Sequence, residues 1–222
     1  MAERANSKAE QVYSTIKESI LTGALEPGAP IDKLELCDRL GVSRFPVSAA
    51  ISRLAFEQLV VVEPQHGSFV ARISMRDVQE RLFIRRALEG EVVEEAARRF
   101  GPEDREALRR NLDEAIAAAE AGDRSLFYAL DVAFHAYFTQ KLGLLRSAEL
   151  LDALRVHLER VRRLLLAPAG RINATIAEHK AIIEGLQSGD PALARRSMEA
   201  HMNEFSAICN NFARERPDLF SA

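Results

Sequence analysis

The sequence predicts a mostly helical protein of two domains, the first of which also carries a short β-hairpin. Apolar residues recur at helical spacing from Gln11 to Leu21 and through most of the chain after Ser74. Two β-branched or aromatic runs, Leu59–Val62 and Phe69–Ala71, flank a turn at Pro64–Gly67. Glycine followed by a capping or first-turn residue separates most of the expected helices, so their ends are well marked.

Three short helices are expected before the hairpin. The first carries its apolar stripe within 11–21, and Asp32 can cap the second, which ends at Gly41. Ser43 can cap the third, and Pro46 falls in its first turn, where a missing N–H costs little. Three helices followed by two strands and a tip are the layout of a winged helix-turn-helix.

The remainder of the chain indicates helices only. Clear joints divide it into about six helices of an antiparallel bundle, at Gly101-Pro102, Gly122-Asp123, Leu142-Gly143, 167–170 and Gly189-Asp190-Pro191. Because the extended pattern gives way to helical spacing near Ile73, we assign residues 1–73 to the first domain and 74–222 to the second.

Composition is that of an ordinary globular protein, with 47% hydrophobic and 28% charged residues among 222. No apolar stretch reaches the roughly 18 residues that span a bilayer, and no signal-peptide pattern opens the chain. We therefore expect a cytoplasmic protein without a membrane partner. The net charge of −3 does not favour nucleic-acid binding, so that function must be argued from the placement of particular residues.

One continuous segment supplies this argument. The run Leu36-Cys37-Asp38-Arg39-Leu40-Gly41-Val42-Ser43-Arg44-Phe45-Pro46-Val47 has Pro27-Gly28 upstream and His66-Gly67-Ser68-Phe69-Val70 downstream. Together these residues resemble the signature of GntR-family regulators over the whole N-terminal domain. The resemblance implies binding to a double-stranded DNA operator.

Arg44 is the leading base-contact candidate, because an arginine at the start of a recognition helix can donate two hydrogen bonds to guanine. Gly67 allows a tight wing, whose tip residue His66 could enter the minor groove or contact phosphate. The other DNA-binding residues expected from this segment are Ser43, Pro46 and Ser48.

The segment also departs from the family pattern. Leu34 and Ser48 stand where relatives commonly carry arginine, and Gln58 stands where glycine is common. The operator of this protein therefore cannot be assumed from its relatives. The alternative interpretation is a helix-turn-helix retained only for protein interaction.

A candidate metal site lies in the second domain. Asp131 and His135 are one helical turn apart and share a face, a spacing that is also common on solvated surfaces. His179 and His201 fall in two later amphipathic helices that could face the same interior. One aspartate and three histidines are a sufficient inner shell for a divalent metal.

These positions complete a second resemblance. The pattern Arg85-Arg86-Ala87-Leu88-Glu89, Asp131-x3-His135, Glu178-His179, Gly189-Asp190 and His201 resembles the FCD effector domain of the FadR-type branch of GntR regulators. The resemblance implies that Asp131, His135, His179 and His201 hold zinc, nickel or manganese. It also implies a small carboxylate effector.

Three further residues have roles that the sequence leaves open. Arg85 could pair with the effector acid, or equally with Glu89 one turn later. Thr175 lies one turn before His179 and could point into the same cavity. Glu178 is one residue off the ligand face and is expected to point away from it.

Together, the residues and the two resemblances favour an acid-responsive transcription regulator with no catalytic residues. The resemblance to GntR-family regulators also implies a homodimer. A metal sensor that responds to the ion itself is the first alternative. A metal-dependent hydrolase or lyase is the second, and it lacks an evident acid or base beside the metal ligands.

Overall fold

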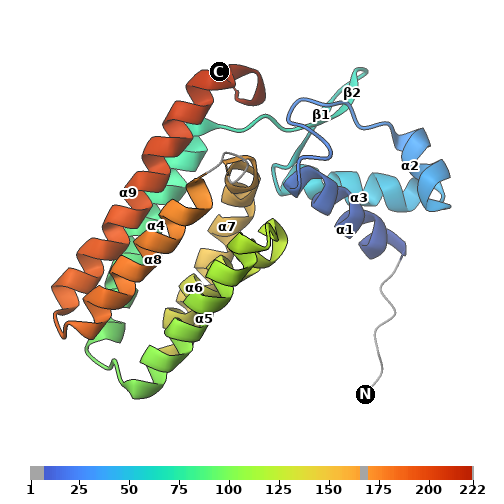
Figure 1. Cartoon of the computed structure of the whole chain (residues 1–222). Helices are drawn as coiled ribbons and strands as arrows, with labels where there is room; N and C mark the ends of the chain where they lie inside the picture. Colours follow the sequence, from blue (N-terminus) through green and yellow to red (C-terminus); the bar gives the residue numbers. More distant parts are fainter. Residues whose placement is uncertain (1–7, 166–169, 222) are drawn as a thin grey trace, which may run out of the picture. The chain divides into compact units, whose positions relative to one another are not determined.

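A computed structural model describes residues 8–165 and 170–221 (Figure 1). These residues divide into two compact units. The first contains the described residues up to Met75, together with Glu159–Leu164 and the C-terminal segment from Ala213. The second contains Arg76–Leu158 and Leu165–Phe212.

The first unit is a winged helix-turn-helix, as the sequence predicts. Its elements are α1 (Lys8–Leu21), α2 (Lys33–Leu40), α3 (Arg44–Phe56), β1 (Val60–Glu63), β2 (Gly67–Val70) and a C-terminal 3-10 helix, η1 (Pro217–Leu219). The strands are antiparallel, with Val60 opposite Val70 and Glu63 opposite Gly67. Asp32 caps α2 by accepting from two backbone N–H groups, and the left-handed Gly41 (φ 61°) ends it.

Helix α3 is held against α1 by apolar packing and by one polar cluster. Ile16 and Ile51 are almost completely buried. At the end of α3, Glu57 accepts hydrogen bonds from Tyr13 (2.6 Å) and Lys17 (2.8 Å) of α1. Burial raises the pKa of the Glu57 carboxyl, but these hydrogen bonds outweigh it and leave the pKa below its ordinary value. The recognition helix therefore has a fixed position within the unit.

The segment that follows the wing is also fixed within this unit. Ile73 donates to the carbonyl of Leu219 (3.0 Å) and accepts from the N–H of Ser221 (2.9 Å). The buried side chain of Arg160 donates to the carbonyl of Ala71 at 2.6 Å. Burial lowers the pKa of Arg160 to about 10, still high enough for a charged side chain at neutral pH.

Six helices within the described residues build most of the second unit, in agreement with the sequence. They are α4 (Met75–Ala97), α5 (Pro102–Glu120), α6 (Arg124–Lys141), α7 (Leu145–Leu165), α8 (Arg171–Gln187) and α9 (Pro191–Glu215). Glu159–Leu164 of α7 and the end of α9 from Ala213 are grouped with the first unit. The predicted joints at Gly101-Pro102, Gly122-Asp123 and Gly189-Asp190-Pro191 coincide with helix starts. The joint predicted at 167–170 lies outside the described residues except for Gly170, which precedes α8.

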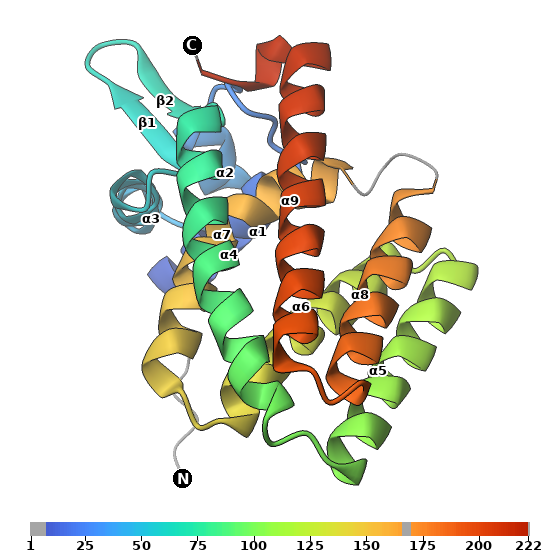
Figure 2. The same ribbon diagram turned by 90° about the vertical axis from the view of Figure 1, so that its left-hand side faces the viewer.

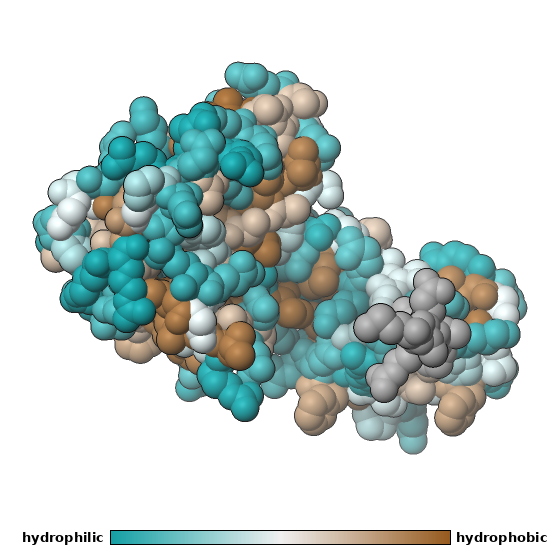
Figure 3. All heavy atoms as spheres, turned by 90° about the horizontal axis from the view of Figure 1, so that it is seen from below, coloured by the Kyte–Doolittle hydropathy of each residue, from teal (hydrophilic) through white to brown (hydrophobic). Residues whose placement is uncertain are grey.

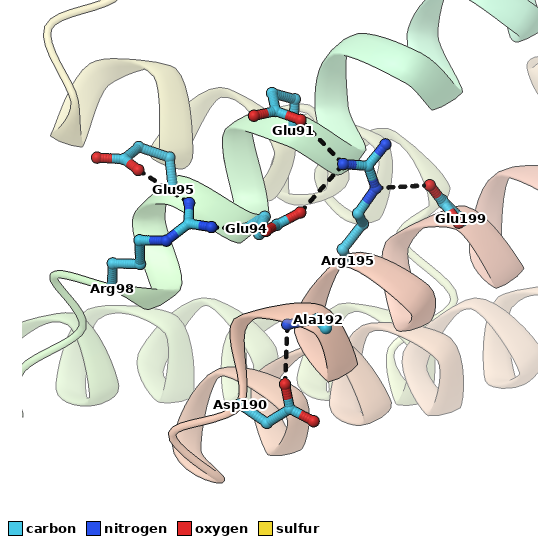
Figure 4. Close-up of polar contacts among 8 residues, drawn as sticks. All are labelled: Glu91, Glu94, Glu95, Arg98, Asp190, Ala192, Arg195 and Glu199. Carbon is cyan, nitrogen blue, oxygen red and sulfur yellow. Dashed lines mark hydrogen bonds and ion pairs between the residues drawn. The ribbon is translucent and has the colours of Figure 1, made fainter.

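Helices α4 and α9 run antiparallel and side by side (Figure 2). Arg195 of α9 donates to Glu91 (2.9 Å) and Glu94 (3.0 Å) of α4, as Figure 4 shows. Helices α8 and α9 approach so closely that a Cβ at Gly185 would lie 2.9 Å from the Cα of Ala194. Helix α9 therefore contacts both α4 and α8.

The core of this unit is shared by five helices, α4, α5, α6, α8 and α9. Val93, Phe134, Ile182 and Met198 are completely buried in it. Among the described residues, no helix is long and apolar enough to cross a membrane. Hydrophilic side chains cover much of the face shown in Figure 3, with smaller apolar patches between them.

One departure from the family pattern falls at a position where the backbone favours glycine. Gln58, which stands where the family pattern has glycine, adopts a left-handed conformation with φ 58°. A side chain is disfavoured in this conformation, whereas glycine adopts it readily.

We therefore expect Gln58→Gly to stabilise the first unit by about 0.5–1 kcal/mol, measured by urea denaturation. Gln11→Gly, an exposed change inside α1, is the matched control and should destabilise by about as much. A loss of stability in Gln58→Gly would show that the Gln58 side chain makes a compensating contact.

Candidate metal centre and DNA-binding surface

Three histidines from three helices meet inside the second unit. His135 comes from α6, His179 from α8 and His201 from α9, and each is at most 4% exposed. One ligand nitrogen of each lies within 4.8 Å of those of the other two. The Nε2 atoms of His135 and His201 are 3.3 Å apart. The sequence expectation that these side chains face one interior is thus met in the structure.

Each imidazole is oriented by a different neighbour. Nδ1 of His135 lies 2.6 Å from a carboxylate oxygen of Glu89, and Nδ1 of His201 lies 2.6 Å from one of Glu178. His179 instead stacks on the ring of Phe134, with centroids 3.9 Å apart and planes at 9°. Because the Nδ1 atoms are engaged with carboxylates, the Nε2 atoms of His135 and His201 are left to face the centre.

Both carboxylates are held in turn by arginines. Arg85 donates from Nε to Glu89 at 2.6 Å, and Arg171 donates to both oxygens of Glu178 at 2.8 and 3.0 Å. Burial raises the pKa of Glu89, but Arg85 and His135 outweigh it and hold the pKa well below its ordinary value. The result is two arginine–glutamate–histidine chains that converge on the histidine cluster.

The donor set fits a divalent transition metal. Imidazole nitrogens suit zinc and nickel, and a histidine ligand commonly donates its second N–H to a carboxylate. Two nitrogens bound tetrahedrally to one Zn²⁺ at about 2.0–2.1 Å would lie about 3.3–3.4 Å apart, close to the observed Nε2 separation. His135 and His201 therefore already have the spacing of two ligands of one ion, and His179, whose ligand nitrogen lies within 4.8 Å of theirs, could supply a third.

The fourth predicted ligand, Asp131, lies at the edge of the cluster. It is buried on α6, and its Oδ1 is 3.6 Å from Nε2 of His179. Thr175 is also buried, and its hydroxyl donates to the carbonyl of Arg171 at 3.2 Å.

The expectation that Glu178 points away from the site is wrong. His179, the next residue on α8, faces the cluster. The side chain of Glu178 is long enough to reach His201 of α9 as well. Sequence reasoning also missed Arg171 as its partner. The spacing from Arg171 to Glu178, seven residues or two helical turns, was the available signal.

A small cavity touches the cluster on one side. It has a volume of about 50 Å³. Its lining includes Arg85, Glu89 and His135, together with Thr139, Asp152 and Arg155. The cavity therefore contacts the Arg85–Glu89–His135 chain and not His179 or His201.

Four of the predicted DNA-reading residues lie at the start of α3 in the first unit, with Ser43 at its N-cap and Ser48 just beyond its first turn. Arg44, Ser48 and Ser43 are exposed there, whereas Pro46 is buried. The hydroxyl of Ser43 does not cap the helix, although the residue stands at the N-cap position. Phe45, which sequence reasoning passed over, is 81% exposed beside Arg44. Its unusual exposure for a phenylalanine was visible only in the structure.

The wing presents its tip as expected. His66 is exposed, and Gly67 has φ 123°, a conformation that favours glycine. Arg53, later on α3, is paired with Glu10 at 2.7 Å and lies over the ring of Tyr13. Its role is thus structural, which leaves Arg44 as the better candidate for DNA contact.

Comparison with known families agrees with the reading of both the winged helix-turn-helix unit and the helical unit. Residues 8–70 match "Bacterial regulatory proteins, gntR family", and residues 80–204 match the FCD domain. The protein belongs to the GntR family, in its FadR-like branch with an FCD domain. It is a DNA-binding transcription regulator, and the curated relatives are named as regulators rather than enzymes.

Several relatives of this GntR-family regulator match nearly its full length. It is 30% identical to the HTH-type transcriptional repressor RspR of Escherichia coli K12, over 96% of this chain and 93% of that protein. It is also 30% identical to a probable D-xylose utilization operon transcriptional repressor of Paenarthrobacter nicotinovorans, over 87% and 85%.

Solved structures share the fold. The match to the E. coli McbR/YncC structure has a TM-score of 0.72 at 24% identity, and it covers 93% of this chain and 98% of the McbR/YncC chain. A putative GntR regulator from Rhodococcus sp. RHA1 has a TM-score of 0.75 at 23% identity, over 92% and 98%.

The histidine cluster makes a direct prediction. His135→Ala removes one of three converging nitrogens, so elemental analysis of purified protein should show metal content falling from about one ion per chain to background. His157→Ala, in α7 and outside the cluster, is the control and should keep its metal. Equal metal content in both variants would exclude the cluster as the metal site.

Proposed function

We propose that this GntR-family protein is a homodimeric regulator whose operator affinity is controlled by a small organic acid. The acid would bind in the helical domain beside a divalent metal ion held by His135, His179, His201 and Asp131. Arg85 would be its main partner, with Thr175 contributing to the same region. The observation that carries the proposal is the buried three-histidine cluster with Arg85 at its edge.

The chemistry of this region favours an anion. Arg85 is about 3% exposed, and its one hydrogen bond recorded among the described residues is from Nε to Glu89. An arginine can donate up to five hydrogen bonds, so the rest of the guanidinium can still bind a carboxylate in the adjoining cavity. A bound metal would supply a second positive charge and a Lewis-acidic position for an oxygen ligand.

Regulation then follows from differential binding. If the acid binds one arrangement of the dimer better than another, it shifts the population between forms that do and do not bind DNA. A coupling of 1–3 kcal/mol would change operator affinity by about 5- to 150-fold.

On the DNA side, the proposal assigns base reading to the first turn of α3. Arg44 can bind guanine through two hydrogen bonds, while the exposed ring of Phe45 suits contact with a thymine methyl group. Ser43, Ser48, His66 and Gly67 would contact the phosphate backbone or adjacent base edges. Since Pro46 is buried, its contribution would be to the shape of this turn.

Small carboxylates should stabilise the metal-loaded protein. At a concentration 100 times its dissociation constant, an acid contributes about 2.7 kcal/mol, or a rise in Tm of about 5–10 °C for a domain of this size. A thermal-shift screen of carboxylates measures this rise, and Arg85→Gln should reduce it.

The same acid should change operator affinity in a fluorescence-anisotropy titration while the metal stays bound. If metal alone switches DNA binding and no acid has an effect, the protein is a metal sensor instead. Turnover of an acid by the metal-loaded protein would contradict the proposal altogether.

For the DNA surface, Arg44→Ala should weaken operator binding by about 1–3 kcal/mol and relax the base preference at one position. Arg53→Ala is the matched control on the same helix, and it should leave that preference intact because Arg53 is paired with Glu10. A uniform loss over all sequences in Arg44→Ala would identify a phosphate contact instead.

A further inference from the structure

We propose that the C-terminal segment Arg216–Ser221 clamps the linker Ala71–Ser74, and that tight binding to an operator with two half-sites depends on this clamp. The linker connects β2, which ends at Val70, to α4, which begins at Met75. The inference involves neither the metal nor the acid of the proposed function. It rests on the homodimer, because two half-sites need two DNA-binding units.

The backbone of the linker is held by a segment far away in the sequence. Within the first unit, Ile73 donates to the carbonyl of Leu219 at 3.0 Å and accepts from the N–H of Ser221 at 2.9 Å. Ile73 and Phe220 thereby form a parallel β-bridge. Connections between domains are usually exposed segments with few contacts, so a hydrogen-bonded linker departs from the common case.

The contact between the two segments is also apolar. The side chains of Ile73, Leu219 and Phe220 are at most 7% exposed. Because a 3-10 helix of three residues makes few hydrogen bonds of its own, the position of η1 depends on this burial. The guanidinium of Arg72 adds a polar contact, since it donates to the carbonyl of Asp218. The linker and the C-terminal segment therefore hold each other.

The clamp ties the linker to the helix that carries His201. Helix α9 is one continuous helix, and the first unit includes its end from Ala213. The 3-10 helix η1 follows at Pro217. In the second unit, Gln79 near the start of α4 donates to Asn210 of α9 at 2.9 Å. The linker and the start of α4 are thus each attached to α9 or to the segment that follows it.

A held linker should favour simultaneous binding to two half-sites. After one unit of a dimer binds DNA, the second binds with an effective concentration set by the stiffness and reach of its connection. A connection already held in the conformation that binds DNA loses less entropy on binding than a free one. Release of the clamp should therefore weaken binding to the whole operator and leave binding to a single half-site unchanged.

A single hydrogen-bond donor can be removed to test the clamp. Ser221→Pro deletes the N–H that Ile73 accepts, and the extended backbone of Phe220 (φ −107°, ψ 152°) is compatible with a following proline. Ser221→Ala, at the same exposed position, keeps the N–H and is the matched control. Phe220→Ala truncates a buried ring and is the stronger variant.

The full-length proteins are titrated by fluorescence anisotropy against an operator selected from random duplexes, and against the same duplex with one half-site scrambled. Ser221→Pro should weaken operator binding about two- to tenfold, as expected for one lost hydrogen bond, and Phe220→Ala about tenfold or more. Ser221→Ala should bind the operator as the wild type does. All variants should bind the scrambled duplex with wild-type affinity. Hydrogen exchange should be faster at Ile73 in Ser221→Pro and unchanged in α3.

Unchanged operator affinity in both Ser221→Pro and Phe220→Ala would overturn the inference. So would an equal loss on both duplexes, because it would indicate damage to the DNA-binding unit itself. Circular dichroism melts identify a variant that fails to fold, and Ser221→Pro, at an exposed position, then carries the test without Phe220→Ala.

The two proposals fail in different ways. If the wild type binds both duplexes equally, the homodimer of the proposed function is wrong. The clamp itself is then tested by hydrogen exchange, and equal exchange at Ile73 in wild type and Ser221→Pro would overturn it.

Discussion

Burial of charge inside the helical unit is the constraint on which the site depends. Arg85, Glu89 and His135 are each at most 4% exposed, and an isolated charge so placed would be strongly destabilising. The chain avoids this by joining arginine to glutamate and glutamate to histidine with short hydrogen bonds. A buried ion pair does not by itself indicate a gain in folding stability, because its replacement by well-packed apolar residues often leaves the free energy of unfolding unchanged or raises it. Its presence here is better explained by the fixed direction that it gives to the imidazole.

The surrounding helices supply the positions rather than the chemistry. Close packing at Gly185 sets α8 against α9, and thereby sets His179 and Glu178 against His201. By contrast, the exposed ion pairs of Arg195 with α4 contribute little each, since solvent screens them. The apolar core and the close approach of backbones thus determine where the histidines meet.

In the DNA-binding unit, too, the contacts that position a helix are separate from the residues exposed on it. Its polar cluster around Glu57 holds α3 to α1, and the exposed face of α3 is left with few charges. Arg44 and Phe45 stand side by side at its start, one suited to hydrogen bonding and the other to apolar contact. Leu34 of α2 and Ser48 of α3 are both uncharged, although the family pattern has arginine at these two positions.

The sequence by itself determined the secondary-structure elements, because apolar spacing, caps and glycines are local signals. It placed the wing, the helix starts at Pro102 and Pro191, and the three histidines in the interior of one helical domain. It could not decide which partner each buried side chain would take. Glu89 meets His135 across 46 residues, and Glu178 meets His201 across 23. Only the packing of α4 on α6, and of α8 on α9, brings these groups within hydrogen-bond distance, because such contacts depend on how whole helices are placed and not on the residues beside them in the chain.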